Sequence, residues 1–218
     1  MIVLALDTCL AACSVAIVDG ERVLARRVEP MSRGHQERLA PLVAEAMAEA
    51  GLKFDQLTRV GVTVGPGSFT GLRVGLAFAK GLGQALSIPV IGIGVLEALA
   101  QPHETSSGLV VAALEAKRGQ VFLQAFADGA PVMAPDGLSI EVAVARVFEL
   151  SGANPIALVG TGASHLSEAF PSARVIVVDH VDPVVVAQLA ATKPVVPPRP
   201  LYLRAPDAKL PGGRELPA

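Results

Sequence analysis

Short apolar runs and helical patterns alternate along the first half of the chain. Asp19-Gly20, between the second and third runs, is a strong signal for a two-residue β-hairpin. A helical pattern then ends at Gly51, a residue typical of helix C-caps, and Pro41 inside it predicts a short first turn or a kink. The expected elements are strands at 2–6, 12–18, 22–28, 59–64 and 89–93 and helices at 35–50, 70–87 and 95–101.

The second half repeats this order of elements. Asp128-Gly129 is again a hairpin signal between two extended segments. The expected elements are strands at 109–114, 120–127, 156–159 and 174–178, an extended segment toward Ile140, and helices at 141–150, 163–170 and 182–192. The matching order predicts two copies of a β-β-β-α-β-α unit, hence an α/β fold with mixed sheets. We expect two small lobes, residues 1–102 and residues 103–218.

Composition narrows the classes of function. The 218 residues include 18 Lys and Arg against 20 Asp and Glu, so the net charge is −2. A dedicated nucleic-acid reader is normally basic, because neutralised phosphates dominate its affinity. There is no Trp, one Tyr and seven Phe, which is a small inventory for base stacking. These features argue against a free-standing RNA or DNA reader, but they are compatible with a subunit of a complex that handles RNA.

The chain also shows features that bear on its location. Its first apolar run lacks a preceding basic segment and is typical of a buried strand, not of a signal peptide. The apolar stretch at 85–100 is interrupted by a proline, two glycines and a glutamate, which argues against a membrane span. From Lys193 onward the chain is rich in proline and has five Lys or Arg against two acids. We expect a soluble cytoplasmic protein with an extended basic tail.

The string Gly65-Pro-Gly-Ser-Phe-Thr-Gly71 lies between an expected strand and an expected helix. Backbone N–H groups and the helix dipole can bind an anion at such a place. The Walker and dinucleotide patterns do not fit, because Leu72 follows Gly71 and Thr70 occupies a glycine position. The alternative is a tight turn in which Thr70 caps the helix.

Asp7 and Thr8 end the first strand, where an acid can face a phosphate or a metal-bound water. The alternative is that Asp7 caps the hairpin through its own backbone. The candidate nucleotide- or anion-binding residues are Asp7, Thr8, Gly65, Gly67 and Ser68.

The helix after this loop carries small residues at strict four-residue spacing. They are Gly71, Gly75, Ala79 and Gly83, which form one nearly straight strip along a helix. Each glycine costs about 1 kcal/mol of helix propensity relative to alanine, so a close backbone contact is expected to compensate. The strip packs either against the chain's own sheet or against the helix of a partner.

The sequence offers little support for a metal site or a nucleophilic serine. None of His35, His103, His165 and His180 has a second histidine three or four residues away, and Ser14 has no histidine near it in the sequence. Cys9 and Cys13 suit no common zinc spacing and are expected to be buried thiols. No catalytic residue, metal ligand or cofactor is predicted.

Several strings together resemble the bacterial TsaB family, also called YeaZ. They are Asp7-Thr8-Cys9, Ser32-Arg-Gly-His35-Gln-Glu-Arg-Leu39-Ala-Pro-Leu42, Gly65-Pro-Gly-Ser-Phe-Thr-Gly-Leu-Arg73, Ala116-Lys-Arg-Gly-Gln-Val-Phe122 and Leu201-Tyr-Leu-Arg204. The resemblance extends over nearly the whole chain. One departure is Glu115, which stands where the family has Asp.

The resemblance implies a duplicated actin/Hsp70/sugar-kinase-like (ASKHA) fold and a role in making threonylcarbamoyl-adenosine. This nucleoside lies next to the anticodon of tRNAs that decode ANN codons. A TsaB protein is implied to be a non-catalytic partner of the paralogue TsaD, joined by the ATPase TsaE, with tRNA bound through the complex. Relatives have been called M22 glycoproteases, but the His-x-x-x-His metal pair of TsaD-like proteins is incomplete here, because Leu39 follows His35 by four residues.

The resemblance also implies an interface on the first two helices. The expected contact positions are Leu39, Leu42, Gly71, Gly75 and Ala79. The same helices are expected to form a homodimer when TsaD is absent. The alternative function is a weak nucleotide-binding ATPase or kinase-like protein of the same fold.

Overall fold

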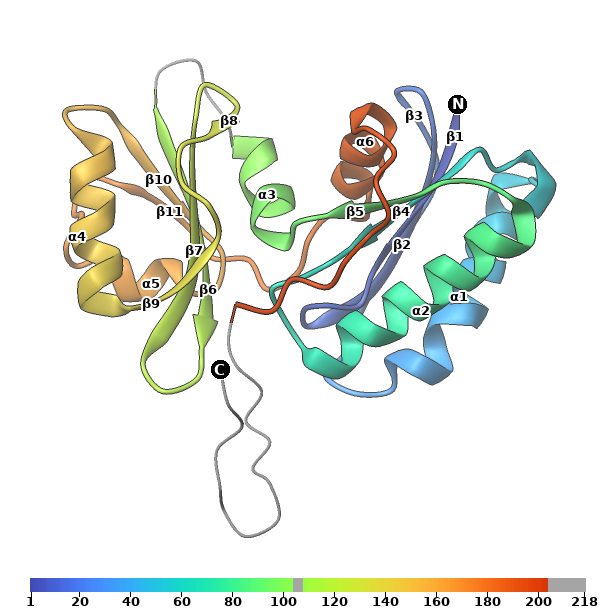
Figure 1. Cartoon of the computed structure of the whole chain (residues 1–218), viewed down its shortest axis with the longest axis horizontal. Coiled ribbons are helices and arrows are strands. Elements are labelled where there is room, and N and C mark those ends of the chain that lie inside the picture. The colour runs from blue at the N-terminus through green and yellow to red at the C-terminus, as the bar shows by residue number, and fades with distance from the viewer. Residues whose placement is uncertain (104–107, 204–218) are drawn as a thin grey trace, which may run out of the picture.

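The first half of the chain builds one mixed sheet, as Figure 1 shows for the computed structural model. Its strands are β1 (Ile2–Asp7), β2 (Ala12–Asp19), β3 (Arg22–Pro30), β4 (Arg59–Thr63) and β5 (Val90–Ile93), in the order β3-β2-β1-β4-β5. The three strands joined by hairpins are antiparallel, whereas β1, β4 and β5 run parallel because helices connect them. The structure describes residues 1–103 and 108–203.

The second half builds a sheet with the same strand order. Its strands are β6 (Leu109–Ala116), β7 (Gln120–Ala127), β8 (Ala130–Pro131), β9 (Asp136–Ser139), β10 (Ile156–Val159) and β11 (Arg174–Ile176). The order is β11-β10-β6-β7-β8, and β9 also pairs with β7. The predicted duplication and α/β fold class are confirmed. The expected extended segment toward Ile140 is two short strands, β8 and β9.

The helices begin and end close to the expected positions. They are α1 (His35–Ala50), α2 (Phe69–Leu86), α3 (Val95–Ala100), α4 (Ile140–Ser151), α5 (Ala163–Leu166) and α6 (Pro183–Thr192), with short 3₁₀ turns η1 (Phe54–Gln56) and η2 (Gln101–His103). The helix α1 runs unbroken through Pro41 and is capped after Ala50 by Gly51, which has a positive φ of 65°. The expected helix at 163–170 was too long, since α5 stops at Leu166.

Two helices each pack against the sheet that the other half of the chain builds. The face of the first sheet opposite α1 and α2 is covered by α6, and α3 packs against β6 and β7 of the second sheet (Figure 1). The helices α4 and α5 cover the other face of the second sheet. The expected boundary after residue 102 falls in the short turn at 101–103 and stays a prediction. The two lobes interlock there, because each sheet takes one covering helix from the other half of the chain.

The segment after α6 returns across the first lobe. Residues 194–203 have no helix or strand, as expected for a proline-rich stretch, and the Leu201 N–H donates to the Val64 carbonyl over 2.8 Å. The rest of the expected basic tail lies outside the described residues. Among the described residues, no helix has the length and apolar character needed to cross a bilayer.

Candidate functional site

The string from Gly65 to Gly71 leads from β4 into the first turn of α2 and lies against the turn between β1 and β2. The Ser68 N–H donates to the Cys9 carbonyl over 2.7 Å. A Cβ added at Gly67 would collide with that carbonyl, and one at Gly71 would collide with the Thr8 carbonyl. The glycines thus let two backbones approach closely, which fits the tight-turn interpretation. The helix cap is Ser68 and not Thr70 as expected, because the Ser68 hydroxyl accepts from the Gly71 N–H over 3.2 Å.

The end of β1 is buried beneath this loop. The Thr8 hydroxyl donates to the Gly71 carbonyl over 2.7 Å. The Oδ1 atom of Asp7 accepts from the Thr63 hydroxyl at 2.6 Å and from the Cys9 N–H at 3.1 Å, so Asp7 caps its own turn. Burial raises the pKa of Asp7 above its ordinary value, and its Oδ2 atom has no hydrogen-bond partner.

The five candidate anion-binding residues therefore meet at one corner of the first lobe but do not form an open cradle. The side chains of Asp7 and Thr8 are at most 1% exposed, and Gly65 is also buried. Gly67 and Ser68 are exposed. A phosphate could approach these two without reaching the carboxylate below them.

The glycine strip on α2 faces the chain's own sheet. A Cβ at Gly75 would lie 2.5 Å from the Thr8 hydroxyl oxygen, and one at Gly83 would collide with Val90 of β5. Ala79 is fully buried between them. The prediction that Gly71, Gly75 and Ala79 contact a partner was wrong, because the small residues there accommodate β1, β4 and β5.

The two leucines expected at the interface are also internal. Leu39 is 1% exposed and Leu42 is fully buried, and both belong to the core beneath α1. Their positions correct the expected interface in the same way as the glycine strip.

The outward face of the two helices carries a second set of small residues at the same spacing. We call it the α1–α2 face and define it by six exposed positions: Ala40, Ala44, Ala48, Ala77, Gly81 and Ala85. A Cβ at Gly81 would meet nothing within 4 Å. Val74, Phe78 and Leu82 lie half-buried on α2. Four-residue spacing was visible in the sequence for this face as well, but spacing alone does not reveal which face is buried.

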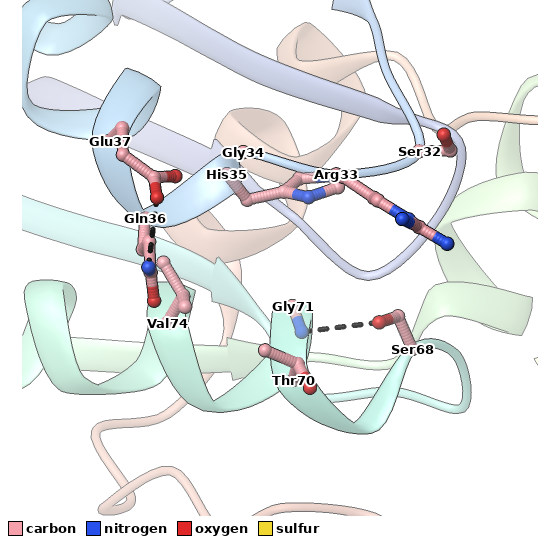
Figure 2. A pocket seen from close by; sticks show the side chains of 10 residues that line it. All are labelled: Ser32, Arg33, Gly34, His35, Gln36, Glu37, Ser68, Thr70, Gly71 and Val74. Atoms are coloured by element: carbon pink, nitrogen blue, oxygen red, sulfur yellow. Dashed lines mark hydrogen bonds between the residues drawn. The ribbon is translucent and has the colours of Figure 1, made fainter.

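A pocket of about 300 Å³ lies where α1 and α2 begin. One wall is the first turn of α1 with the residues before it: Ser32, Arg33, Gly34, His35, Gln36 and Glu37. The other is the start of α2 with its N-cap: Ser68, Thr70, Gly71 and Val74. Figure 2 shows Arg33 and His35 together on one side and Ser68 and Thr70 on the other. The Glu37 carboxylate accepts from the Gln36 amide over 2.9 Å. Sequence reasoning missed this pocket, because its two walls are more than thirty residues apart.

The structure offers no complete metal site among residues 1–103 and 108–203. No group of three His, Cys, Asp or Glu side chains there could hold an ion. His35 is 8% exposed, its Nε2 atom has no hydrogen-bond partner, and Leu39 lies in the core. Cys9 and Cys13 are buried free thiols, as predicted, and burial raises the pKa of Cys13 to about 12.

The corresponding corner of the second lobe is also closed by packing. Glu115 is exposed at the end of β6, where its N–H donates to the Thr161 hydroxyl over 3.0 Å. The Gly162 N–H donates to the Ala113 carbonyl, and a Cβ at Gly160 would collide with that carbonyl. The Gly160-Thr-Gly162 loop thus serves close packing on β6.

Solved structures define the class of this fold. A ROK hexokinase from Thermus thermophilus superimposes with a TM-score of 0.50 at 16% identity, covering 88% of this chain and 98% of the hexokinase. Together with the two similar lobes and their crossing helices, this places the chain in the actin/Hsp70/sugar-kinase-like class.

Closer similarities define the family. YeaZ from Pseudomonas aeruginosa has a TM-score of 0.74 at 30% identity, covering 87% of this chain and 90% of YeaZ. The family model for TsaD, tRNA N6-adenosine threonylcarbamoyltransferase, matches residues 28–171. The TsaB protein of Escherichia coli is 36% identical over 124 residues, 56% of this chain and 53% of that protein. An uncharacterized protein of Mycobacterium tuberculosis is 36% identical over 211 residues, 95% of this chain and 93% of its own. The chain belongs to the TsaB (YeaZ) family.

Proposed function

We propose that this chain takes part in tRNA threonylcarbamoyladenosine biosynthesis as a non-catalytic partner subunit. The curated TsaB relatives carry the name of this pathway. In the proposal, the chain pairs with a TsaD paralogue that performs the transfer, TsaE joins the complex, and tRNAs that decode ANN codons bind through it. A cytoplasmic location remains a prediction.

The observation that carries the partner role is the α1–α2 face. Six small residues are exposed there, and Gly81 has no neighbour that would compensate for a glycine inside a helix. An exposed glycine at such a place costs about 1 kcal/mol relative to alanine. A partner helix that packs against small side chains can approach closely and supply that compensation. The match to a TsaD model supports a paralogue with similar first helices as this partner.

The chemistry at the corner of the first lobe supports a non-catalytic role. Asp7 and Thr8 are buried and use their oxygens on Cys9, Thr63 and Gly71. His35 lacks a histidine partner at position 39. These contacts disfavour the alternative of an ATPase or kinase-like protein that acts through Asp7, Thr8 and the Gly65 loop.

The test introduces a charge on the α1–α2 face. Ala77→Arg is expected to reduce co-purification with the same organism's TsaD at least tenfold, because a long cationic side chain holds the two helices apart. The melting temperature of the isolated chain should stay within about 2 °C, since Ala77 is exposed. In depleted cells, the variant should fail to restore threonylcarbamoyl-adenosine in tRNA.

A matched control is Ala145→Arg, an exposed alanine on α4 of the second lobe. It should leave association and tRNA modification unchanged. Intact TsaD association by Ala77→Arg would contradict the proposed face. Normal tRNA nucleosides after depletion of the chain would contradict the proposed function.

A further inference from the structure

Three side chains from two distant parts of the chain stack on the surface at the start of α2. The Arg73 guanidinium carbon lies 3.7 Å from the centroid of the Phe69 ring, and the centroids of Phe69 and Tyr202 are 5.5 Å apart. The Arg73 Nε atom also donates to the Tyr202 hydroxyl over 3.3 Å. Phe69 is 48% exposed and Tyr202, the chain's only tyrosine, is 46% exposed. Large areas of both rings are therefore left in water.

The position of Tyr202 is set by the segment that returns from α6. The Leu201 N–H donates to the Val64 carbonyl, and a Cβ at Gly65 would lie 2.9 Å from the Leu201 carbonyl oxygen. Upstream, a Cβ at Gly92 would lie 3.1 Å from that of Pro198. This close packing against β4, β5 and the loop holds the tyrosine beside Phe69.

The two segments that bring Phe69, Arg73 and Tyr202 together carry only positively charged side chains. No Asp or Glu occurs between Asp55 and Glu97 or between Asp182 and the last described residue, Leu203. Arg73 and Arg199 are exposed, and the pocket that Ser68 and Thr70 share with α1 adds the exposed Arg33. Among the described residues, none of these three arginines forms an ion pair with a carboxylate. Glu37, the one acid lining the pocket, accepts the Gln36 amide.

Exposed aromatic side chains beside arginines that lack an ion pair are typical of proteins that bind single-stranded nucleic acid. Bases stack on the rings and on guanidinium planes, and arginines bind the phosphates. The pocket is lined by Ser68 and Thr70, the two sequence neighbours of Phe69, and by His35, whose Nε2 has no partner. It also includes the start of α2, whose first turn contains no acid. A phosphate there would approach one helix start and Arg33 while an adjacent base reaches the rings.

We propose that Phe69, Arg73 and Tyr202, with Arg33 at the adjoining pocket, bind a single-stranded segment of RNA. The proposal rests on the proposed function to the extent that tRNA is the RNA expected in the complex. It assigns this chain a direct contact with that RNA. A protein partner on the same surface is the alternative outcome.

The test measures fluorescence anisotropy of a labelled 12-nucleotide oligouridylate with the full chain, alone and with its TsaD paralogue. The wild-type chain should bind detectably at 50 mM salt and at least tenfold more weakly at 200 mM salt, because its phosphate contacts are electrostatic. Tyr202→Ala and Phe69→Ala should each weaken binding by about 5- to 150-fold, the range that lost base stacking produces. Arg73→Gln should reduce the slope of log affinity against log salt concentration by the amount expected for the loss of about one phosphate contact.

Matched controls come from α4. Phe148 is 57% exposed and stacks on Phe170 with centroids 4.4 Å apart, and Arg146 is exposed beside Glu149. Phe148→Ala and Arg146→Gln should leave RNA affinity unchanged. Tyr202→Phe keeps the ring and should bind within twofold of wild type. Comparison of Tyr202→Ala with Tyr202→Phe therefore tests stacking even if Phe69→Ala is unstable.

Three results would overturn the proposal: no binding by the wild-type chain at 50 mM salt, equal losses in the α4 controls, or unchanged affinity in Tyr202→Ala. If the variants of this surface lose TsaD association but keep their RNA affinity, the surface binds a protein partner instead. Failure of the proposed function is distinguishable, because it appears as absent TsaD association or normal tRNA nucleosides, whereas RNA affinity is measured separately.

Discussion

At the scale of single residues, the corner beneath the loop is a closed set of polar contacts. The Asp7 carboxylate is held by the Thr63 hydroxyl and its own turn, and Thr8 is bonded to Gly71. Asp7 nevertheless carries an unpartnered oxygen in a fully buried position, which makes its ionised form costly.

Asp7→Asn tests this cost through its pH dependence. Because burial raises the folded-state pKa of Asp7, the folded chain is destabilised progressively as pH rises from the ordinary value of 3.8 through the folded-state pKa. The variant should therefore gain melting temperature relative to wild type as pH rises from 4 to 8. Each kcal/mol of relief corresponds to about 2–4 °C for a chain of this size.

The same variant also addresses function. If Asp7 is structural, Asp7→Asn should restore threonylcarbamoyl-adenosine in depleted cells as wild type does. If the gain in melting temperature of Asp7→Asn over wild type shrinks as pH rises, ionisation of the buried Asp7 is not costly in the folded chain. Loss of tRNA modification by a stably folded variant would favour the nucleotide-binding alternative.

At the scale of elements, α2 carries two strips of small residues with different roles. One strip, from Gly71 to Gly83, lets the helix lie close to β1, β4 and β5. The other, from Ala77 to Ala85, faces outward. Both have the same spacing, so helical periodicity predicts two strips but not their orientation. The deciding fact is which face meets the sheet.

A pair of glycine-to-alanine variants separates the two strips. Gly75→Ala should lower stability by about 1–3 kcal/mol, because the new methyl group would overlap the Thr8 hydroxyl oxygen at 2.5 Å. Gly81→Ala should raise stability by about 0.5–1 kcal/mol in the isolated chain, because its Cβ meets open space and alanine favours helix. Chemical denaturation of the two variants beside wild type measures both effects. Equal effects would contradict the assignment of the strips.

At the scale of the whole molecule, the two halves are joined by the exchange of α3 and α6. The strand β4 has a glycine, Gly61, where α6 packs against it. A Cβ at Gly61 would lie 2.7 Å from the Ala190 side chain, so the missing side chain lets α6 approach. One continuous core includes Val62 of the first sheet, Val110 of the second and Val186 of α6. Duplication of the unit thus does not imply independence of the halves.

Separate halves should consequently fail to fold. A fragment of residues 1–102 would expose the apolar face that α6 covers, so it should be insoluble or lack a cooperative thermal transition. Co-expression with residues 103–218 should restore a soluble complex with a single transition, because α6 is supplied again. Differential scanning calorimetry of each fragment and of the pair makes the measurement. A cooperative transition in the fragment of residues 1–102 alone would contradict the role of α6.

Most of the elements could be predicted from the sequence because their signals are local. The hairpin at Asp19-Gly20, the helix that ends at Gly51 and the repeated order of elements depend on neighbouring residues. The buried state of Cys9 and Cys13 was predicted as well. The family resemblance rested on strings that are also local, and the comparisons confirmed it.

Only the tertiary structure decided which surfaces are open. In the structure the strip from Gly71 to Gly83 faces the chain's own sheet, and Leu39 and Asp7 are buried. The helix α6 packs against the sheet of the other half. The fold also brings Tyr202 beside Phe69, although more than 130 residues separate them. The physical reason is that periodicity and turn chemistry act over a few residues, whereas burial and pairing depend on which distant segments pack together.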